Sequence, residues 1–124
     1  MDRKQLLKML NSQAVMVWDS LCEIYPDLTK FDCPKISLNG RFWRTAGICL
    51  QEENKIELGT KFFGSPKNRD IMLNVILPHE IIHQADFDLF GESEKNCGHG
   101  EKWCEIMVQY GLEPNPYHSM DVKR

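Results

Sequence analysis

The stretch His79-Glu80-Ile81-Ile82-His83 reads H-E-x-x-H and lies where apolar residues recur with helical spacing. Four residues advance an α-helix by about 400°, so both imidazoles project from nearly the same side, one turn apart. Two ring nitrogens at this spacing can bind one zinc ion. Glu80 is rotated by about 100° from His79, and in helices of this kind the carboxylate reaches the water on the metal and does not bind the metal itself. The stretch therefore predicts a helix that carries a zinc site.

A catalytic zinc site needs three protein ligands and one open position. His99, in Gly98-His99-Gly100, is one candidate for the third ligand, and the segment after His83 is long enough for the chain to return to the site. A glutamate could instead complete a His-His-Glu site, or two cysteines could join His99 in a closed structural site. Spacing leaves these alternatives open: Glu92, Glu94, Glu101, Glu105, Cys97 and Cys104.

The helical pattern around the motif begins near Asn68 and ends at Phe90-Gly91. Pro78 lies inside it and lacks a backbone N–H, so the helix should kink or restart there. A last helix is predicted over about residues 99–110, with Gly111 as its C-terminal cap. The motif helix and this last helix are therefore expected to be neighbours in sequence, joined by a polar loop.

The first helix is predicted over roughly residues 3–22, because apolar residues recur there at alternating three- and four-residue steps. Asp2 can cap this helix, with Gln5 three residues later as the reciprocal partner. The apolar stripe is interpreted as a face that packs on the core.

The middle of the chain has the pattern of strands. Residues 35–38 alternate and stop at Asn39-Gly40, a strong hairpin signal, and a second run extends from Arg41 to Leu50. Residues 56–58 alternate again after a polar turn. Gly47 inside the second run indicates a bulge or a close backbone approach. The expected fold is α+β: an N-terminal helix, a small three-stranded antiparallel sheet, the motif helix and a closing helix, in a single domain over residues 1–124.

Composition excludes several classes of protein. The 124 residues are 42% hydrophobic and 27% charged, which argues against disorder, and no apolar run approaches the roughly 18 residues of a membrane helix. A net charge of −3 disfavours a strongly basic nucleic-acid binder. The five cysteines form no C-x-x-C pair and follow no secretory signal, so we expect a reducing, cytoplasmic location.

A short basic and aromatic group, Arg41-Phe42-Trp43-Arg44, is the main candidate for contact with nucleic acid, since aromatic rings stack on bases and arginines bind phosphates. Lys61, Lys67 and Arg69 could extend this group. The competing interpretation is an ordinary strand with one aromatic in the core and its charges in solvent.

With these motifs in view, the chain resembles the SprT-like metalloproteases, which include bacterial SprT and the eukaryotic Spartan proteases. Four segments carry the resemblance over roughly residues 34–120. They are Thr45-Ala46-Gly47 leading to Lys55-Ile56-Glu57-Leu58, Pro78-His79-Glu80-Ile81-Ile82-His83, Gly98-His99-Gly100-Glu101-Lys102-Trp103 with Met107, and the tail Gly111, Pro114 and His118.

The resemblance implies a zinc-dependent metallopeptidase with His79, His83 and His99 as ligands and Glu80 as catalytic base. Its substrate would be a protein or peptide, and relatives cleave proteins bound or crosslinked to DNA. The cysteines lack the spacing of the zinc ribbon found in many relatives, so any DNA association is expected to be weak or mediated by a partner. Besides the metal, the candidates for stabilising the oxyanion are His118, Tyr117, Tyr110 and Arg44.

Two rival functions differ in class from a peptidase. In one, the zinc is structural, bound in a closed four-ligand site with Cys97 or Cys104, and the protein is an adaptor. In the other, the fold is that of an inactive relative which binds protein or DNA. Substitution of Glu80 separates the second rival from an enzyme, because a non-catalytic protein does not need this carboxylate.

Overall fold

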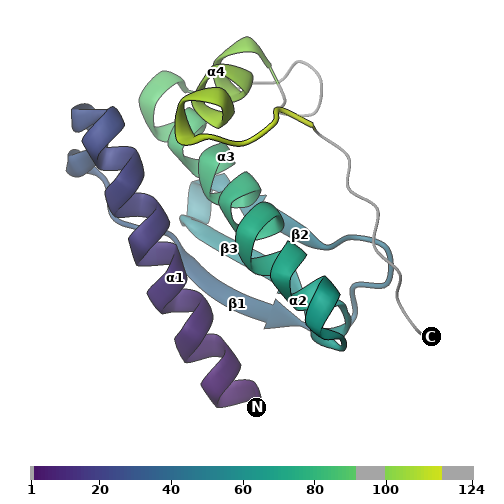
Figure 1. Ribbon diagram of the computed structural model, residues 1–124. Helices are drawn as coiled ribbons and strands as arrows, with labels where there is room; N and C mark the ends of the chain where they lie inside the picture. Colours follow the sequence, from purple (N-terminus) through teal and green to yellow (C-terminus); the bar gives the residue numbers. More distant parts are fainter. Residues whose placement is uncertain (1, 92–99, 116–124) are drawn as a thin grey trace.

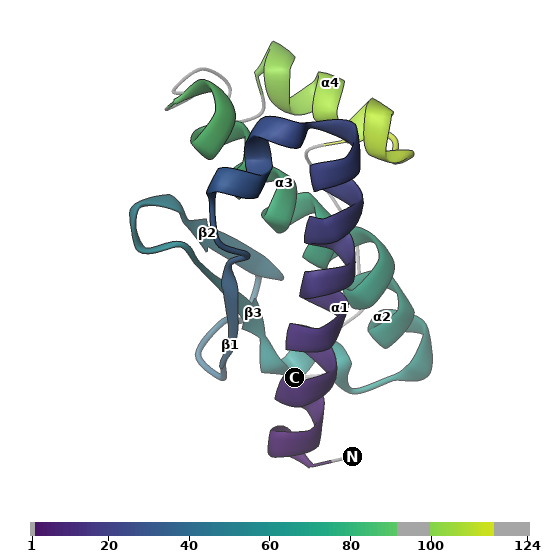
Figure 2. The same cartoon turned by 90° about the vertical axis from the view of Figure 1, so that its left-hand side faces the viewer.

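The computed structural model describes residues 2–91 and 100–115. Helix α1 (Arg3–Ile24) and helix α3 (Leu77–Phe90) pack on one face of a small sheet, and helix α4 (Glu101–Tyr110) packs on α3 (Figures 1 and 2). The α+β class is therefore confirmed, whereas the single-domain organisation stays a prediction. The elements are α1 (Arg3–Ile24), β1 (Lys35–Asn39), β2 (Gly47–Leu50), β3 (Lys55–Gly59), α2 (Pro66–Ile71), α3 (Leu77–Phe90) and α4 (Glu101–Tyr110).

Helix α1 begins at the predicted capping box. The Asp2 side chain accepts a hydrogen bond from the Gln5 backbone N–H at 2.8 Å, and the Gln5 side chain accepts one from the Asp2 backbone N–H at 3.0 Å. The buried face consists of Leu6, Leu10, Ala14, Val17, Trp18 and Leu21. The sequence predicts Leu7 as the first member of this stripe, but Leu6 is buried there and Leu7 is only half-buried. The local sequence specifies the start and the buried face of this helix, because the capping residues and the apolar stripe both lie within the segment.

The sheet has three strands, as predicted, but it is mixed and not antiparallel. The strand order is β1-β3-β2, with β1 parallel to β3 and β2 antiparallel to β3. The predicted turn between the second and third strands is present: a short 3-10 turn over Gln51–Glu53 precedes Asn54 in the left-handed conformation. Strand β3 is therefore central, and the antiparallel prediction was wrong for its pairing with β1.

The predicted hairpin at Asn39-Gly40 was wrong. Neither residue has the positive φ that a type I′ hairpin turn requires, and the Asn39 side chain instead accepts a hydrogen bond from the Arg41 N–H at 2.9 Å. This local Asx turn starts a loop through Ala46, so the second strand begins at Gly47 and not at Arg41. The loop carries the chain beyond the position that β3 occupies, and β2 therefore pairs with β3 and not with β1.

The motif helix is preceded by a π-helical segment, Met72–Ile76, which continues from α2. The Leu77 N–H donates to the Met72 carbonyl, five residues earlier. Pro78 lies in the first turn of α3, where its missing N–H is tolerated. The restart predicted at this proline is confirmed.

Helix α4 ends as predicted at Gly111, which has a φ of 106°. The Gly111 N–H donates to the Val108 carbonyl and the Leu112 N–H to the Met107 carbonyl, which is a Schellman motif. The predicted start at residue 99 lies outside the described residues, and the helix is described from Glu101.

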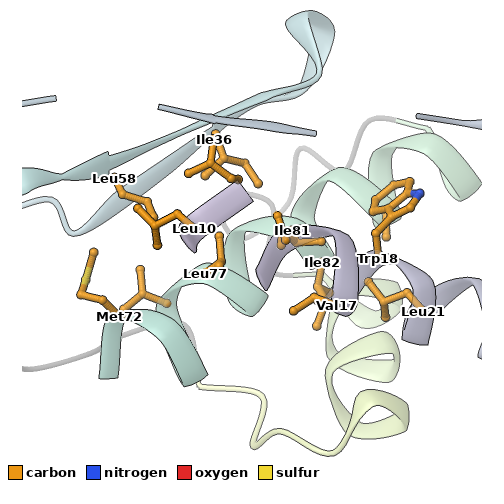
Figure 3. Packing of buried hydrophobic residues seen from close by; sticks show 14 of the residues in the cluster. Leu10, Val17, Trp18, Leu21, Ile36, Leu58, Met72, Leu77, Ile81 and Ile82 are labelled. Carbon is orange, nitrogen blue, oxygen red and sulfur yellow. The ribbon is translucent and has the colours of Figure 1, made fainter. Parts of the chain in front are cut away.

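The hydrophobic core lies between the sheet and the helices (Figure 3). Leu10 from α1, Ile36 and Leu58 from the sheet, and Leu77 and Ile81 from α3 meet there, and each is at most 1% exposed. Burying a side chain of this size stabilises the fold by about 1.5–3 kcal/mol. Within the described ranges, no helix combines the length and apolar character needed to cross a membrane.

Candidate metal centre

Helix α3 brings His79, Glu80 and His83 together in a buried position. Their exposed fractions are 4%, 8% and 7%. Three elements, α1, β2 and α4, pack around this helix. They shield both its apolar and its polar residues from solvent. The one-turn spacing predicted from the sequence therefore places the two histidines together in a buried cluster with Glu80.

The geometry of the cluster fits a divalent metal ion. The Nε2 atoms of His79 and His83 lie 3.2 Å apart, and the His79 Nε2 lies 3.7 Å from the Glu80 Oε2. Two imidazoles bound tetrahedrally to zinc at about 2.05 Å would have their nitrogens about 3.3 Å apart. Potential ligand atoms of all three residues lie within 4.8 Å of one another, and they form the single such group among the described residues. The group could thus bind a metal ion.

Burial raises the pKa of Glu80 to about 8, because the apolar surroundings disfavour its charged form. A divalent cation between the two imidazoles would lower this pKa, since a nearby positive charge favours the carboxylate. Glu80 is therefore placed where its protonation state depends on what the histidines bind.

Trp103 of α4 forms one wall of the cluster. Its ring stacks on His83, with centroids 5.2 Å apart and an angle of 18°, and meets His79 edge-on at 4.9 Å. From the sequence, Trp103 was named only as the end of a segment that resembles the family, and was not assigned to the site. Its position in the H-G-x-x-W block was the one signal that it belongs to the site.

Strand β2 forms the opposite wall. In the sheet register, Gly47 pairs with Leu58 and Cys49 with Ile56, so both face α3. A Cβ atom on Gly47 would lie 3.2 Å from the Glu80 Cγ and 2.8 Å from a Leu58 methyl carbon. The close backbone approach predicted at Gly47 is confirmed, and the residue approached is Glu80.

Cys49 lies half-buried in β2 and was not assigned to the site from the sequence. Its thiol lies 3.4 Å from the Gln84 Oε1 and donates to it. Burial, with the nearby charges of Glu80 and Asp88, raises the pKa of this thiol well above its usual range. It therefore stays protonated and acts as a hydrogen-bond donor, and it is absent from the His79-Glu80-His83 group.

Asp86 is a second buried carboxyl that sequence analysis did not single out. It is 2% exposed, its Oδ1 has no hydrogen-bond partner among the described residues, and burial raises its pKa to about 6. It lies three residues after His83, so helical geometry puts both on the same side of α3.

The remaining predicted site residues fall in three groups. Tyr110 packs against the core and burial raises its pKa, while Arg44 is exposed in the loop before β2. Of the alternative ligands, Glu101, Glu105 and Cys104 are described and do not join the cluster around His79 and His83. The others lie outside the described residues, and their roles stay predictions: His99, Tyr117, His118, Glu92, Glu94 and Cys97.

The fold and the cluster define an α+β protein whose H-E-x-x-H helix, enclosed by a strand and a tryptophan, forms a candidate metal centre. The model of the SprT-like family matches residues 18–121, and the chain belongs to this family.

Bacterial relatives named Protein SprT show the same relationship. The chain is 35% identical to Protein SprT of Pseudomonas fluorescens and 33% identical to that of Pseudomonas entomophila, over 76% of this chain and 55% of each relative. Identity to Protein SprT of Shewanella oneidensis is 28%, over 64% of this chain and 49% of that protein. The chain thus spans about half the length of these relatives. No solved structure matches it.

Proposed function

We propose that the chain is a zinc-dependent metallopeptidase of the SprT-like family. The observation that carries this proposal is the convergence of two imidazole nitrogens, 3.2 Å apart, with a buried carboxylate on one turn of α3. Both histidines are nearly buried, so their ring nitrogens are held in the interior beside Glu80. Family membership supports the same chemistry.

Three histidines would hold the zinc: His79 and His83 of α3, and His99. When bound, zinc supplies a Lewis acid and lowers the pKa of a bound water toward neutrality. Glu80 would serve as the general base for the attacking water and as the proton donor to the leaving amine. His118, Tyr117, Tyr110 and Arg44 stay the candidates for stabilising the oxyanion.

The two edges of the sheet indicate where an extended substrate would bind. The outer edge of β1 is covered by α1: Asn11 pairs with both the N–H and the carbonyl of Ile36, and Arg3 donates to the Leu38 carbonyl. Strand β2, next to Glu80, pairs only with β3 among the described residues. An extended peptide added to β2 would therefore run past the metal centre.

DNA association is a second proposal, supported by one surface feature. Arg41, Trp43 and Arg44 are exposed in the loop before β2, and the Lys61 ammonium lies over the Trp43 ring. Single-stranded DNA binds such combinations of cations and aromatic rings. Replacing Arg41 and Arg44 by alanine should weaken binding of single-stranded DNA and make its salt dependence shallower, as measured by fluorescence anisotropy. Unchanged binding would contradict this proposal.

A cytoplasmic location also remains a proposal. Among the described residues, Cys22, Cys33 and Cys49 have free thiols, which suits a reducing compartment.

The central experiment compares the wild-type chain with Glu80→Gln, both loaded with zinc. We expect about one zinc per chain in both, and cleavage of an unfolded protein that falls by about 10²–10⁴-fold in the variant, because only the general base is lost. Elemental analysis and a gel-based cleavage assay provide the two measurements.

Each alternative result points to a different function. Zinc bound without cleavage by the wild-type chain would favour the structural-zinc adaptor. Cleavage retained by Glu80→Gln would exclude Glu80 as the base. Absence of zinc from both proteins would favour an inactive relative that binds protein or DNA.

A further inference from the structure

The edge strand β2 is attached to α3 by a second contact besides Gly47. Gln84, the residue after His83, is 1% exposed and lies under the end of β2. Its Nε2 donates to the carbonyl of Gln51 at 3.1 Å, directly after the last residue of β2. The Gln84 side chain of α3 therefore supplies to the Gln51 carbonyl the hydrogen-bond donor that a neighbouring strand would otherwise supply.

The amide of Gln84 makes three hydrogen bonds in this position, which use both of its N–H groups and its oxygen. The second N–H of Nε2 donates to the Asp88 Oδ1 at 2.9 Å, and Oε1 accepts from the Cys49 thiol at 3.4 Å. A buried amide with both N–H groups and its oxygen bonded has one allowed orientation. Gln84 is thus a fixed link between β2 and α3.

A reciprocal contact runs from the strand to the helix. The Nε2 of Gln51 donates to the carbonyl of His83 at 3.5 Å. The two glutamines therefore join the end of β2 to the turn of α3 that carries a candidate metal ligand. At the start of the strand, Gly47 contacts Glu80. Strand β2 is consequently held against the site at both of its ends.

We propose that Gln84 is a positioning residue that fixes the substrate-binding edge of β2 relative to Glu80 and His83. The inference rests on the proposed peptidase function. Packing alone would be satisfied by an apolar side chain, whereas the three hydrogen bonds of Gln84 set a distance and an angle between strand and helix. A substrate paired to β2 would then present its peptide carbonyl at a constant position beside Glu80.

The test replaces Gln84 by methionine, which has a similar shape and none of these hydrogen bonds. The matched control is Gln109→Met, at an exposed glutamine of α4. Each zinc-loaded protein is assayed with a peptide long enough to pair with all four residues of β2 and with a peptide too short to do so. The measured quantities are zinc content, kcat and KM for both peptides.

We expect Gln84→Met to retain its zinc and to lose about 10- to 100-fold in kcat/KM for the long peptide, chiefly through KM, with little change for the short one. Gln109→Met should match the wild-type chain. A loss that is equal for both peptides indicates a purely structural role and overturns the inference, as does an unchanged preference for the long peptide.

A second variant covers the case in which Gln84→Met does not fold. Gln51→Ala removes only the reciprocal bond, at a partly exposed residue, and should reduce the preference for the long peptide in the same direction. An unchanged preference in this variant then overturns the inference. If the zinc-loaded wild-type chain cleaves neither peptide, the proposed function itself has failed.

Discussion

Helices α1 and α3 pack on the same face of the sheet, but they bury different side chains. Helix α1 buries one apolar stripe of six residues in 22 and leaves its polar side in solvent. Helix α3 buries ten consecutive residues, Leu77–Asp86, on all its sides. Five of these ten are polar or ionisable: His79, Glu80, His83, Gln84 and Asp86.

Both helices contribute apolar residues to the core, but only α3 also carries the candidate metal centre. Burial of an ionisable group costs free energy unless the group gains compensating bonds. The buried ionisable residues of α3 are therefore not explained by stability alone. Its Glu80 and Asp86 both have pKa values raised by burial. We therefore expect substitutions of buried apolar residues in α1 to change the free energy of unfolding, and substitutions of His79, Glu80 or His83 in α3 to change function.

The largest effect is expected for His83→Ala in α3. Loss of this imidazole should reduce zinc from about one per chain to a small fraction of that value, because a catalytic zinc needs three protein ligands and only two of the proposed histidines would remain. Elemental analysis after dialysis measures the zinc content per chain. Circular dichroism of the metal-free proteins serves as the control for folding. Full zinc content in the variant would mean that the metal is bound elsewhere.

The next largest effect is expected for Leu10→Ala in α1. Leu10 is fully buried, so the change should lower the free energy of unfolding by about 2–5 kcal/mol, and zinc content in the remaining folded protein should not change. Val15→Ala, on the exposed side of the same helix, is the matched control and should change stability by less than about 0.5 kcal/mol. Equal effects of the two substitutions, measured by urea denaturation, would contradict the assigned core.

A pH-dependent effect is expected for Asp86→Asn in α3. The pKa of Asp86 is raised from 3.8 to about 6 on folding, so the folded state binds the proton more tightly than the unfolded state. The wild-type chain should therefore lose stability as pH rises from about 4 to 6, by at most about 3 kcal/mol.

The substitution Asp86→Asn removes this titration. The variant should equal the wild-type chain near pH 3 and exceed it in stability above about pH 7, as measured by urea denaturation across this range. A variant that is less stable at high pH would show that the carboxylate of Asp86 has a favourable partner.

The smallest effect is expected for Asp2→Ala at the start of α1. Removing the capping side chain should cost about 1 kcal/mol, because the Gln5 N–H loses its acceptor at an exposed site where water can replace it. Thermal unfolding measures the change. A loss as large as that of Leu10→Ala would mean that Asp2 has a role beyond the cap.

The candidate site was partly predictable because its central residues are close in sequence. H-E-x-x-H needs only helical periodicity to bring His79 and His83 together. Trp103 and Gln84 were not assigned to the site, since their roles depend on how α4 and β2 pack on α3. Gly47 was assigned a close approach, but its neighbour Glu80 is 33 residues away and could not be named.

By itself, the sequence determined the helices, the cap at Asp2, the restart at Pro78 and the side of α3 that carries the histidines. These features depend on spacing within one turn or on a single residue's backbone chemistry. Only the tertiary structure decided that β1 runs parallel to β3, and that Asn39 forms a local turn in place of a hairpin. It also decided which polar residues of α3 are buried, because strand pairing and burial depend on segments far apart in the chain.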